Sequence, residues 1–415
     1  MVQTFDTNSR TLHKKLWDQL YPDKSLIMLS GPRQSGKTTF ARDIAAKDFS
    51  DVVYFNWDIA EDKRRLVDDP VFFSKIPRGS VSSRPLVILD EIHKYRNWKN
   101  YLKGIYDQFA REYQFLVTGS GRLEFSRKAG DSLAGRFFKF HIFPFTLAEL
   151  CSAGRELGDF LDNPLEGFDG ILSGETGHIF QTLWELSGFP EPFIKGKKSF
   201  WSAWSMAYDQ QIVRDDLRTL ADIRNLDLVE TLFALIPSRV GSPLSMNNLA
   251  RDLQVAFDTV KNWLLLFDSF YLTFRLSPWT AKISRSILKE KKIYLFNYPV
   301  IEDEAARFEN MVALEFLRAV EMWKDYGWGS FTLHYLRDKD KLEVDFLIVK
   351  NNKPLLLVET KLSDDAPSAS LINFQDYLNI PAVQLVKKEG IKKIYKNKKN
   401  NILVVTAHRW LSALP

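Results

Sequence analysis

The sequence predicts an α/β multidomain protein whose N-terminal part is a parallel sheet covered by helices on both faces. Short apolar runs alternate with helical stretches along the first third of the chain, which is the pattern of a doubly wound parallel sheet. The length of 415 residues corresponds to several domains at roughly 100–200 residues each. The predicted strands of this sheet are residues 25–30, 51–56, 85–90 and 113–118.

The pattern along the chain predicts four parts. Residues 1–150 contain the parallel sheet and begin with a helix at residues 10–22, and residues 151–225 form a helical lid region. Residues 226–298 show the order helix, helix, turn, helix, strand, strand, which is typical of a winged helix. Residues 299–415 return to an α/β pattern.

The composition excludes several classes of protein. The hydrophobic fraction of 45% supplies enough apolar material for packed cores, which excludes a mainly disordered chain. The single cysteine, Cys151, excludes a disulfide framework and a Cys-based zinc site, and it fits a cytoplasmic protein. No apolar run reaches the ~18 residues that a membrane span needs, so we expect no membrane partner. The net charge of +5 permits a nucleic-acid partner without requiring one.

Residues 31–38 read GPRQSGKT and fit the phosphate-binding pattern G-x-x-x-x-G-K-[ST]. The motif follows a predicted strand and precedes a predicted helix, which is the context it requires. Its glycines allow backbone conformations that turn N–H groups toward phosphate. Lys37 would reach the β- and γ-phosphates, and the Thr38 hydroxyl would bind Mg²⁺. The motif therefore predicts ATP and Mg²⁺ as cofactors.

The ends of two further strands complete the predicted ATP site. Asp90 would hold Mg²⁺ with Thr38, and Glu91 would be the catalytic base that polarises the attacking water. Thr118 ends the next strand, where a polar side chain could sense the γ-phosphate. The predicted nucleotide-binding residues are Gly31, Pro32, Arg33, Gln34, Ser35, Gly36, Lys37, Thr38, Thr39, Asp90 and Thr118.

A family resemblance is carried by four segments, GPRQSGKTT, LVILDEIHK, LVTGSGRL and SLAGRFFKFHIFPFTLAEL. They resemble the AAA+ P-loop ATPases of the archaeal and bacterial type that carry an uncharacterised C-terminal domain, and the resemblance extends to residue 415. AAA+ enzymes commonly complete the ATP site with an arginine from a neighbouring subunit. Arg136 and Arg122 are the candidates for this catalytic role, which requires a homo-oligomer. Pairing of Arg136 with a local carboxylate is the alternative.

Charged residues of the C-terminal part form a second candidate site. Two predicted strands, residues 342–349 and 355–361, would form a hairpin that brings Asp345 near Glu359 and Lys361. Carboxylates hold Mg²⁺ through hard oxygen ligands, and the metal activates water for phosphodiester hydrolysis. A lysine beside the metal can orient that water or offset developing charge.

The order Asp, then Glu-x-Lys, is similar to the core of the restriction-endonuclease-like (PD-(D/E)XK) nucleases. That family also places an acidic residue on the preceding helix. Glu309 lies on a largely apolar stripe of a predicted helix, and it is the third predicted metal ligand beside Asp345 and Glu359. Family members often carry a proline before the metal-binding Asp, where this chain has Val344. The resemblance implies the fold; cleavage, with Lys361 as a catalytic residue, is a separate expectation, because such domains can keep the fold without the activity.

The sequence therefore predicts an ATP-hydrolysing protein that acts on DNA. The expected DNA contacts are a recognition helix at residues 257–267, with Asp258, Lys261 and Asn262 exposed, and the lysine-rich run 387–399. The alternative for that run is a solvated turn. The alternative for the whole chain is a nucleotide-operated switch or DNA-binding scaffold with an inactive nuclease-like domain. A P-loop kinase is disfavoured because no acceptor pocket is evident.

Overall fold

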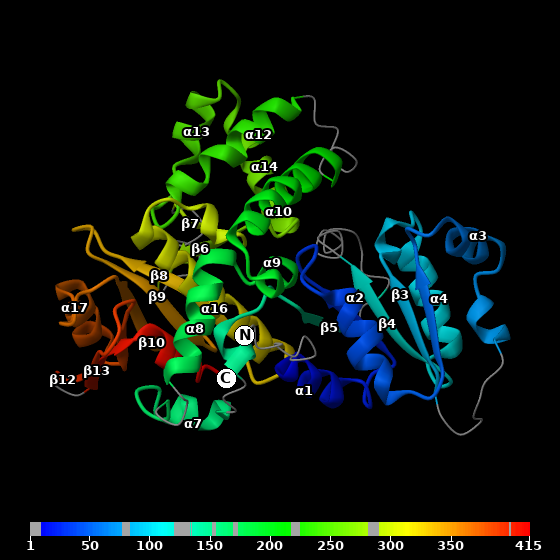
Figure 1. Ribbon diagram of the computed structural model, residues 1–415, viewed down its shortest axis with the longest axis horizontal. Helices are drawn as coiled ribbons and strands as arrows, with labels where there is room; N and C mark the ends of the chain where they lie inside the picture. Colours follow the sequence, from blue (N-terminus) through cyan, green and yellow to red (C-terminus); the bar gives the residue numbers. More distant parts are fainter. Residues whose placement is uncertain are drawn as a thin grey trace. The chain divides into compact units, whose positions relative to one another are not determined.

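The computed structural model describes residues 10–76, 84–119, 133, 135–151, 155–168, 173–216, 225–280, 290–397 and 400–415. The chain divides into two compact units, each with its own sheet (Figure 1). The first unit comprises Met1–Pro144 and Ser269–Tyr271, and the second comprises Phe145–Asp268 and Leu272–Pro415. Among the described residues, no helix has the length and apolarity needed to cross a membrane.

The first unit contains a five-stranded sheet in the order β2-β3-β4-β1-β5. Every neighbouring pair is parallel, so the prediction of a parallel α/β core is confirmed. The three central strands are buried along their whole length, as expected when helices cover both faces. The strands are β1 (Leu26–Ser30), β2 (Val52–Asn56), β3 (Leu86–Asp90), β4 (Gln114–Gly119) and β5 (Phe138–His141).

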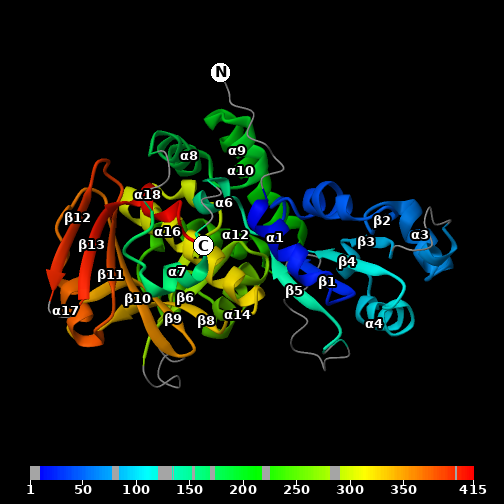
Figure 2. The same cartoon turned by 90° about the horizontal axis from the view of Figure 1, so that it is seen from below.

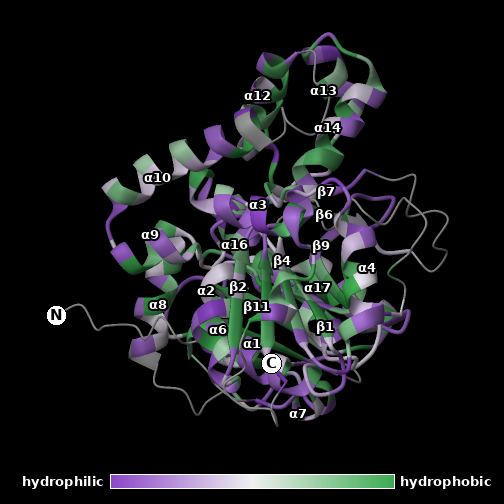
Figure 3. Cartoon of the chain, turned by 90° about the vertical axis from the view of Figure 1, so that its right-hand side faces the viewer, coloured by the Kyte–Doolittle hydropathy of each residue, from purple (hydrophilic) through white to green (hydrophobic). Residues whose placement is uncertain are grey.

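The helices of the first unit present apolar residues to this sheet and charged residues to solvent. Leu102, Ile105 and Phe109 of one helix share an apolar cluster with side chains of β2, β3 and β4. By contrast, the helix AEDKRRLVD, α3, is coloured mostly hydrophilic in Figure 3 and buries only Leu66. The helical elements are α1 (Thr11–Leu20), α2 (Lys37–Thr39), η1 (Phe40–Ile44), η2 (Ala45–Asp48), α3 (Ala60–Asp68), η3 (Phe72–Lys75), η4 (Ile92–Lys94) and α4 (Trp98–Phe109).

The second unit begins with helices, as the sequence predicts. Between residues 226 and 269 the structure has three α-helices in the order expected for a winged helix, with a short 3-10 helix after the first. Asp258, Lys261 and Asn262 are exposed on the third of them. The helices are α6 (Leu147–Cys151), α7 (Leu157–Asp162), α8 (Ser173–Leu186), α9 (Pro190–Lys195), α10 (Lys198–Gln210), η6 (Gln211–Asp216), α12 (Leu226–Leu235), η7 (Pro237–Arg239), α13 (Met246–Asp252) and α14 (Phe257–Ser269).

An eight-stranded mixed sheet follows, in the order β12-β13-β11-β10-β9-β8-β6-β7. Figure 2 shows β12, β13, β11 and β10 side by side. The two strands expected to form a wing, β6 and β7, pair with each other, and β6 also pairs with β8. They therefore extend the C-terminal sheet. The strands are β6 (Thr273–Pro278), β7 (Lys292–Leu295), β8 (Phe331–Arg337), β9 (Glu343–Lys350), β10 (Lys353–Lys361), β11 (Ala382–Val386), β12 (Lys392–Asn397) and β13 (Asn400–Thr406).

The predicted C-terminal hairpin forms between β9 and β10. Asn351 and Asn352 make the turn with φ values of +50° and +63°, a conformation that asparagine tolerates better than most residues. The predicted helix before the hairpin is α16 (Glu304–Asp325), whose first turn is capped by the Asp303 carboxylate. The remaining helices are η8 (Tyr298–Val300), α17 (Ala369–Leu378) and α18 (Ala407–Leu411).

Much of the lysine-rich run 387–399 lies on β12, which is an edge strand of this sheet. Lysines on an edge strand oppose unwanted pairing with another chain. Lys393 pairs with Asp365, and Lys387 contacts Glu304 and the ring of Trp184. For the described lysines of this run, these local contacts support the alternative of a solvated surface segment.

The buried carboxyl of Glu315 on α16 predicts a pH dependence of stability. Burial raises the pKa of Glu315 to about 7 from its ordinary value of 4.5, although its Oε1 accepts a hydrogen bond from Leu147 N at 2.7 Å. The folded state therefore loses stability as the pH rises from 4.5 through about 7. Glu315→Gln should remove a penalty of roughly 3 kcal/mol at pH 8. Chemical denaturation at pH 5 and pH 8 tests this; an equal difference between variant and parent at both pH values would contradict it.

Candidate functional sites

The phosphate-binding loop connects β1 to α2 with the local geometry that the motif requires. A Cβ atom at Gly31 would lie 2.0 Å from the backbone oxygen of Ile142, so only glycine fits there. Gly36 has φ +91°, a conformation that L-residues rarely adopt. Lys37 is buried, and its Nζ donates hydrogen bonds to the backbone oxygens of Gly31 and Pro32. The ammonium group therefore lies inside the loop.

Asp90, at the end of β3, connects three neighbouring side chains. Its Oδ2 accepts hydrogen bonds from Thr38 Oγ1 at 2.7 Å and from Tyr54 Oη at 2.8 Å, and its Oδ1 accepts one from Thr118 Oγ1. Side chains from β2, β3, β4 and the start of α2 thus meet at one carboxylate. Burial, and next the Asp90 charge, raise the pKa of Tyr54, which keeps that hydroxyl a hydrogen-bond donor.

Glu91 directly follows β3 in a left-handed backbone conformation, with φ +55°. Its Oε2 is buried and makes no hydrogen bond with the residues that the structure describes, but Lys94 Nζ lies 3.2 Å away and His93 Nε2 lies 3.7 Å away. Oε2 is therefore held by nearby charge. Glu91 thus places a carboxylate acceptor directly after Asp90, close enough that its charge acts on Lys37.

Arg10 supports the loop, although no motif or periodicity in the sequence marks it out. Its Nη1 donates to Phe143 O at 2.9 Å, and its Nη2 donates to Ser35 O. The guanidinium thus ties the phosphate-binding loop to the chain that follows β5. The remaining predicted loop residues differ in exposure: Ser35 is buried, whereas Gln34 and Thr39 are exposed.

Arg136 makes a two-pronged ion pair with Asp107 on α4, with Nε 2.7 Å from Oδ1 and Nη2 3.3 Å from Oδ2. This is the local pairing that the sequence left as the alternative. Arg122, the other candidate, lies outside the described residues.

The trans role of Arg136 remains a prediction. If it acts across an interface, mixing Arg136→Ala and Lys37→Ala subunits should restore ATP hydrolysis. At a mixed interface the Lys37→Ala subunit would supply Arg136 to the intact phosphate-binding loop of the Arg136→Ala subunit. A trans arginine contributes ~10³–10⁵ in rate where it operates in GTPases. Phosphate release by mixed oligomers is the measurement. No restoration in confirmed mixed oligomers would assign Arg136 its local role only.

The second candidate site surrounds a lysine that the sequence did not single out. Lys292, the first residue of β7, is fully buried. Its Nζ lies 2.6 Å from Glu343 Oε1, 2.9 Å from Glu309 Oε1 and 3.6 Å from Asp345 Oδ1. Burial alone would lower the pKa of Lys292, but the three carboxylates raise it above its ordinary value. Two of the three predicted metal ligands thus share one ammonium group.

The third predicted ligand, Glu359, pairs with Lys361. Lys361 Nζ lies 2.8 Å from Glu359 Oε1, while Glu359 Oε2 is buried and accepts no hydrogen bond from any described residue. Burial, and next the charge of Asp345, raise the pKa of Glu359 to about 7. Both oxygens of Asp345 are engaged. Oδ1 lies 3.6 Å from Lys292 Nζ, and Oδ2 accepts hydrogen bonds from Thr360 N at 2.9 Å and from Thr360 Oγ1 at 2.7 Å. Within the described part of the chain, no group of three or more His, Cys, Asp or Glu is arranged to hold a metal ion.

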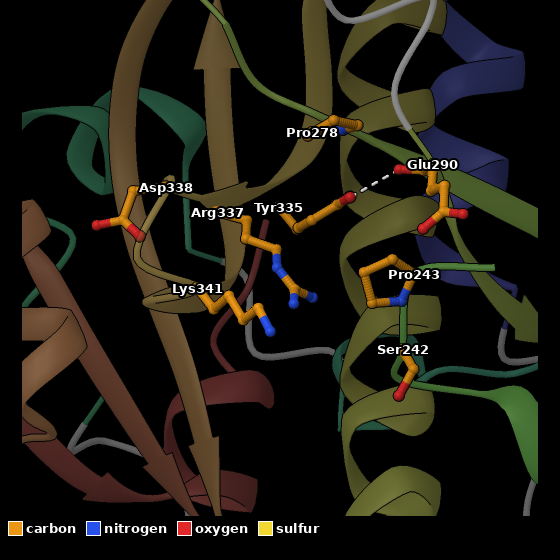
Figure 4. Close-up of a pocket in the computed structure, with 8 residues that line it drawn as sticks. All are labelled: Ser242, Pro243, Pro278, Glu290, Tyr335, Arg337, Asp338 and Lys341. Atoms are coloured by element: carbon orange, nitrogen blue, oxygen red, sulfur yellow. Dashed lines mark hydrogen bonds between the residues drawn. The ribbon is translucent and has the colours of Figure 1, made fainter. Parts of the chain in front are cut away.

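Two hollows adjoin this cluster. A cavity of about 870 Å³ is lined by Glu309, Asp345, Thr360 and Lys361 on one side and by part of residues 234–242 on the other. A second cavity, of about 580 Å³, also includes Ser242. In Figure 4, Arg337 and Lys341 extend toward Ser242 and Pro243 across this second cavity, and Tyr335 donates a hydrogen bond to the backbone oxygen of Glu290.

Residues 23–151 match the model of a family described as an AAA domain. The matched segment contains the phosphate-binding loop, Asp90 and the parallel sheet. The first unit contains an AAA-type P-loop domain. Two further matches, residues 177–298 and 305–408, are each described as a domain of unknown function (DUF8612 and DUF4143).

Relatives of this P-loop protein occur in bacteria and archaea. An uncharacterized protein of Mycobacterium tuberculosis is 22% identical over 343 residues, which span 79% of this chain and 68% of that protein. An uncharacterized protein of Methanocaldococcus jannaschii is 24% identical over 298 residues, which span 67% of this chain and 62% of that protein.

Two solved structures resemble the P-loop protein at low identity. A Walker-type ATPase of Pyrococcus abyssi has 13% identity and a TM-score of 0.43, over 72% of this chain and 94% of the other. The Orc1 protein of Aeropyrum pernix in complex with DNA has 14% identity and a TM-score of 0.34, over 76% of this chain and 94% of the other. At these scores the assignment of the first unit rests on the family match and on its own geometry.

Proposed function

We propose that this chain binds and hydrolyses ATP with Mg²⁺ at the phosphate-binding loop and that its second unit acts on DNA. The observation that carries the first half is the junction at Asp90, where Thr38, Tyr54 and Thr118 donate to one carboxylate. This junction brings the hydroxyl and carboxylate that suit Mg²⁺ together beside the loop that suits phosphate.

The residues of the loop have separable roles in this proposal. Thr38 and Asp90 would hold Mg²⁺, which would neutralise charge on the phosphates. Lys37 would exchange its bonds to Gly31 O and Pro32 O for bonds to the terminal phosphates. Glu91 would accept a proton from the attacking water at a carboxylate oxygen.

Three features of the second unit support DNA as its partner. The helix order from α12 to α14 is that of a winged helix, with Lys261 and Asn262 exposed on α14. Arg337 and Lys341 line a hollow next to the acid cluster together with Glu290 and Asp338, and Arg337 Nη1 pairs with Glu343 Oε2 at 3.1 Å, so Lys341 is the cation there that we expect to reach DNA. Glu309, Asp345, Glu359 and Lys361 occur in the order typical of metal-dependent nucleases. We therefore propose a C-terminal nuclease-like domain.

A second candidate function is favoured by Lys292. In this version the chain is a nucleotide-operated switch or DNA-binding scaffold whose nuclease-like domain does not cut. The supporting observation is that Lys292 Nζ already pairs with Glu309 and approaches Asp345 to 3.6 Å, so an ammonium group holds the acids that a metal would need.

Incubation with labelled linear, branched and single-stranded DNA separates the two versions. The experiment uses Mg²⁺, with and without ATP, and compares the parent protein with Asp345→Asn and Lys37→Ala. Cleavage lost in Asp345→Asn would support the nuclease. Binding without cleavage, changed by ATP in the parent but not in Lys37→Ala, would support the scaffold. Neither binding nor cleavage would contradict action on DNA in both versions.

A further inference from the structure

We infer that the Lys292 ammonium group takes the place of a divalent cation in the acid cluster, so that this domain holds its carboxylates together without metal. The inference rests on the proposed nuclease-like character of the second unit. It goes further by naming the residue that would make the site metal-independent.

The position of Lys292 carries the inference. Its Nζ contacts carboxylates from α16 and β9, at 2.9 Å for Glu309 and 2.6 Å for Glu343, and it also approaches Asp345. The side chain is only 1% exposed, so water does not compete for these contacts. A cation in contact with converging carboxylates removes the repulsion that would otherwise call for a metal.

One oxygen of each of three carboxylates is also engaged by another group. Glu309 Oε1 accepts a second hydrogen bond, from Tyr294 Oη at 2.7 Å. Asp345 Oδ2 is held by Thr360, and Glu359 Oε1 is held by Lys361. Mg²⁺ demands near-octahedral oxygen ligands. The arrangement therefore does not fit a divalent ion while Lys292 is in place.

The backbone of Lys292 leaves its side chain little freedom to withdraw. The residue pairs with Leu276 of β6 and forms a bridge with Pro243 on its other side. The residues just before that bridge also lie against the cluster, because a Cβ atom at Gly241 would be 3.0 Å from Glu309 Oε2. An ammonium group buried by strand pairing needs carboxylate partners, which explains why the lysine and the acids occur together.

The test is a calorimetric titration of the full-length, nucleotide-free protein with Mn²⁺, together with thermal melting. The parent should show no Mn²⁺ binding at the cluster. Lys292→Met, which keeps the chain length but removes the charge, should bind one Mn²⁺ per chain and melt at a higher temperature in its presence. The double variant Lys292→Met, Asp345→Asn should lose that site. Lys291→Met is the matched control, because the charges that act on this neighbouring lysine are those of Arg275 and Asp268, and it should behave like the parent.

Two results would overturn the inference. One is Mn²⁺ binding by the parent that disappears in Asp345→Asn. The other is a folded Lys292→Met protein that binds no Mn²⁺. If Lys292→Met folds only with Mn²⁺, the inference is supported; if it does not fold at all, Lys292→Gln carries the same test. Failure here leaves phosphate release and DNA binding by the parent unchanged, whereas failure of the proposed function would appear as loss of those two readouts.

Discussion

Replacement of Lys37 by alanine is expected to lower ATP hydrolysis by at least ~10²–10³-fold, the typical cost of removing a preorganised electrostatic group, and to weaken nucleotide binding. Lys37 is buried inside the loop, where its Nζ is held by two backbone oxygens. Alanine would leave the terminal phosphates without this cation. Phosphate release and binding of a fluorescent ATP analogue measure the two effects.

Lys47→Ala is the matched control, because Lys47 is an exposed lysine on η2, which follows α2 and η1 in the chain. It should hydrolyse ATP at the parental rate. Equal rates for Lys37→Ala and the parent would contradict the role of Lys37.

Burial also lowers the pKa of Lys37 to about 8, and phosphate favours the charged form. Nucleotide affinity should therefore fall as the pH rises above 8, and this fall should be absent in Lys37→Ala.

Glu91→Gln is expected to keep ATP binding and lose turnover, by ~10²–10⁴-fold, the usual contribution of a general base. The substitution keeps the shape of the side chain and removes only its ability to accept a proton. Binding should survive because Lys37, Thr38 and Asp90 are unchanged. Single-turnover hydrolysis and ATP-analogue binding, measured on the same preparation, check both halves.

Asp58→Asn provides the control for charge near this base. Asp58 is the other carboxylate that contacts Lys94, with Oδ2 2.6 Å from its Nζ. If the loss in Glu91→Gln came only from disturbing Lys94, Asp58→Asn should reproduce it. Parental turnover in Glu91→Gln would show that another group accepts the proton.

The features predicted well from the sequence are local ones. The loop motif fixes Lys37 and Thr38 by spacing, and parallel strand order predicts that the strand ends Asp90 and Thr118 meet beside them. The β9–β10 hairpin follows from two alternating runs around Asn351 and Asn352.

The features missed depend on long-range pairing that no local pattern encodes. Lys292 reads as the start of an ordinary apolar strand. It reaches Asp345 and Glu343 because β6 joins β8, which places β7 at the end of the same sheet. Arg10 likewise contacts Phe143, 133 residues away in sequence. The acids Glu309 and Asp345 alone suggest metal ligands, whereas the fold also places the Lys292 cation beside them.

The most direct test of ATP hydrolysis at the loop is phosphate release from ATP by the purified protein, with Mg²⁺ and with Lys37→Ala as the matched control for contaminating ATPases. We expect the parent to release phosphate and Lys37→Ala to release none. Phosphate release by Asp90→Asn should also be lost, because Thr38, Tyr54 and Thr118 lose their common carboxylate. Equal phosphate release by all three proteins would contradict ATP hydrolysis at this site.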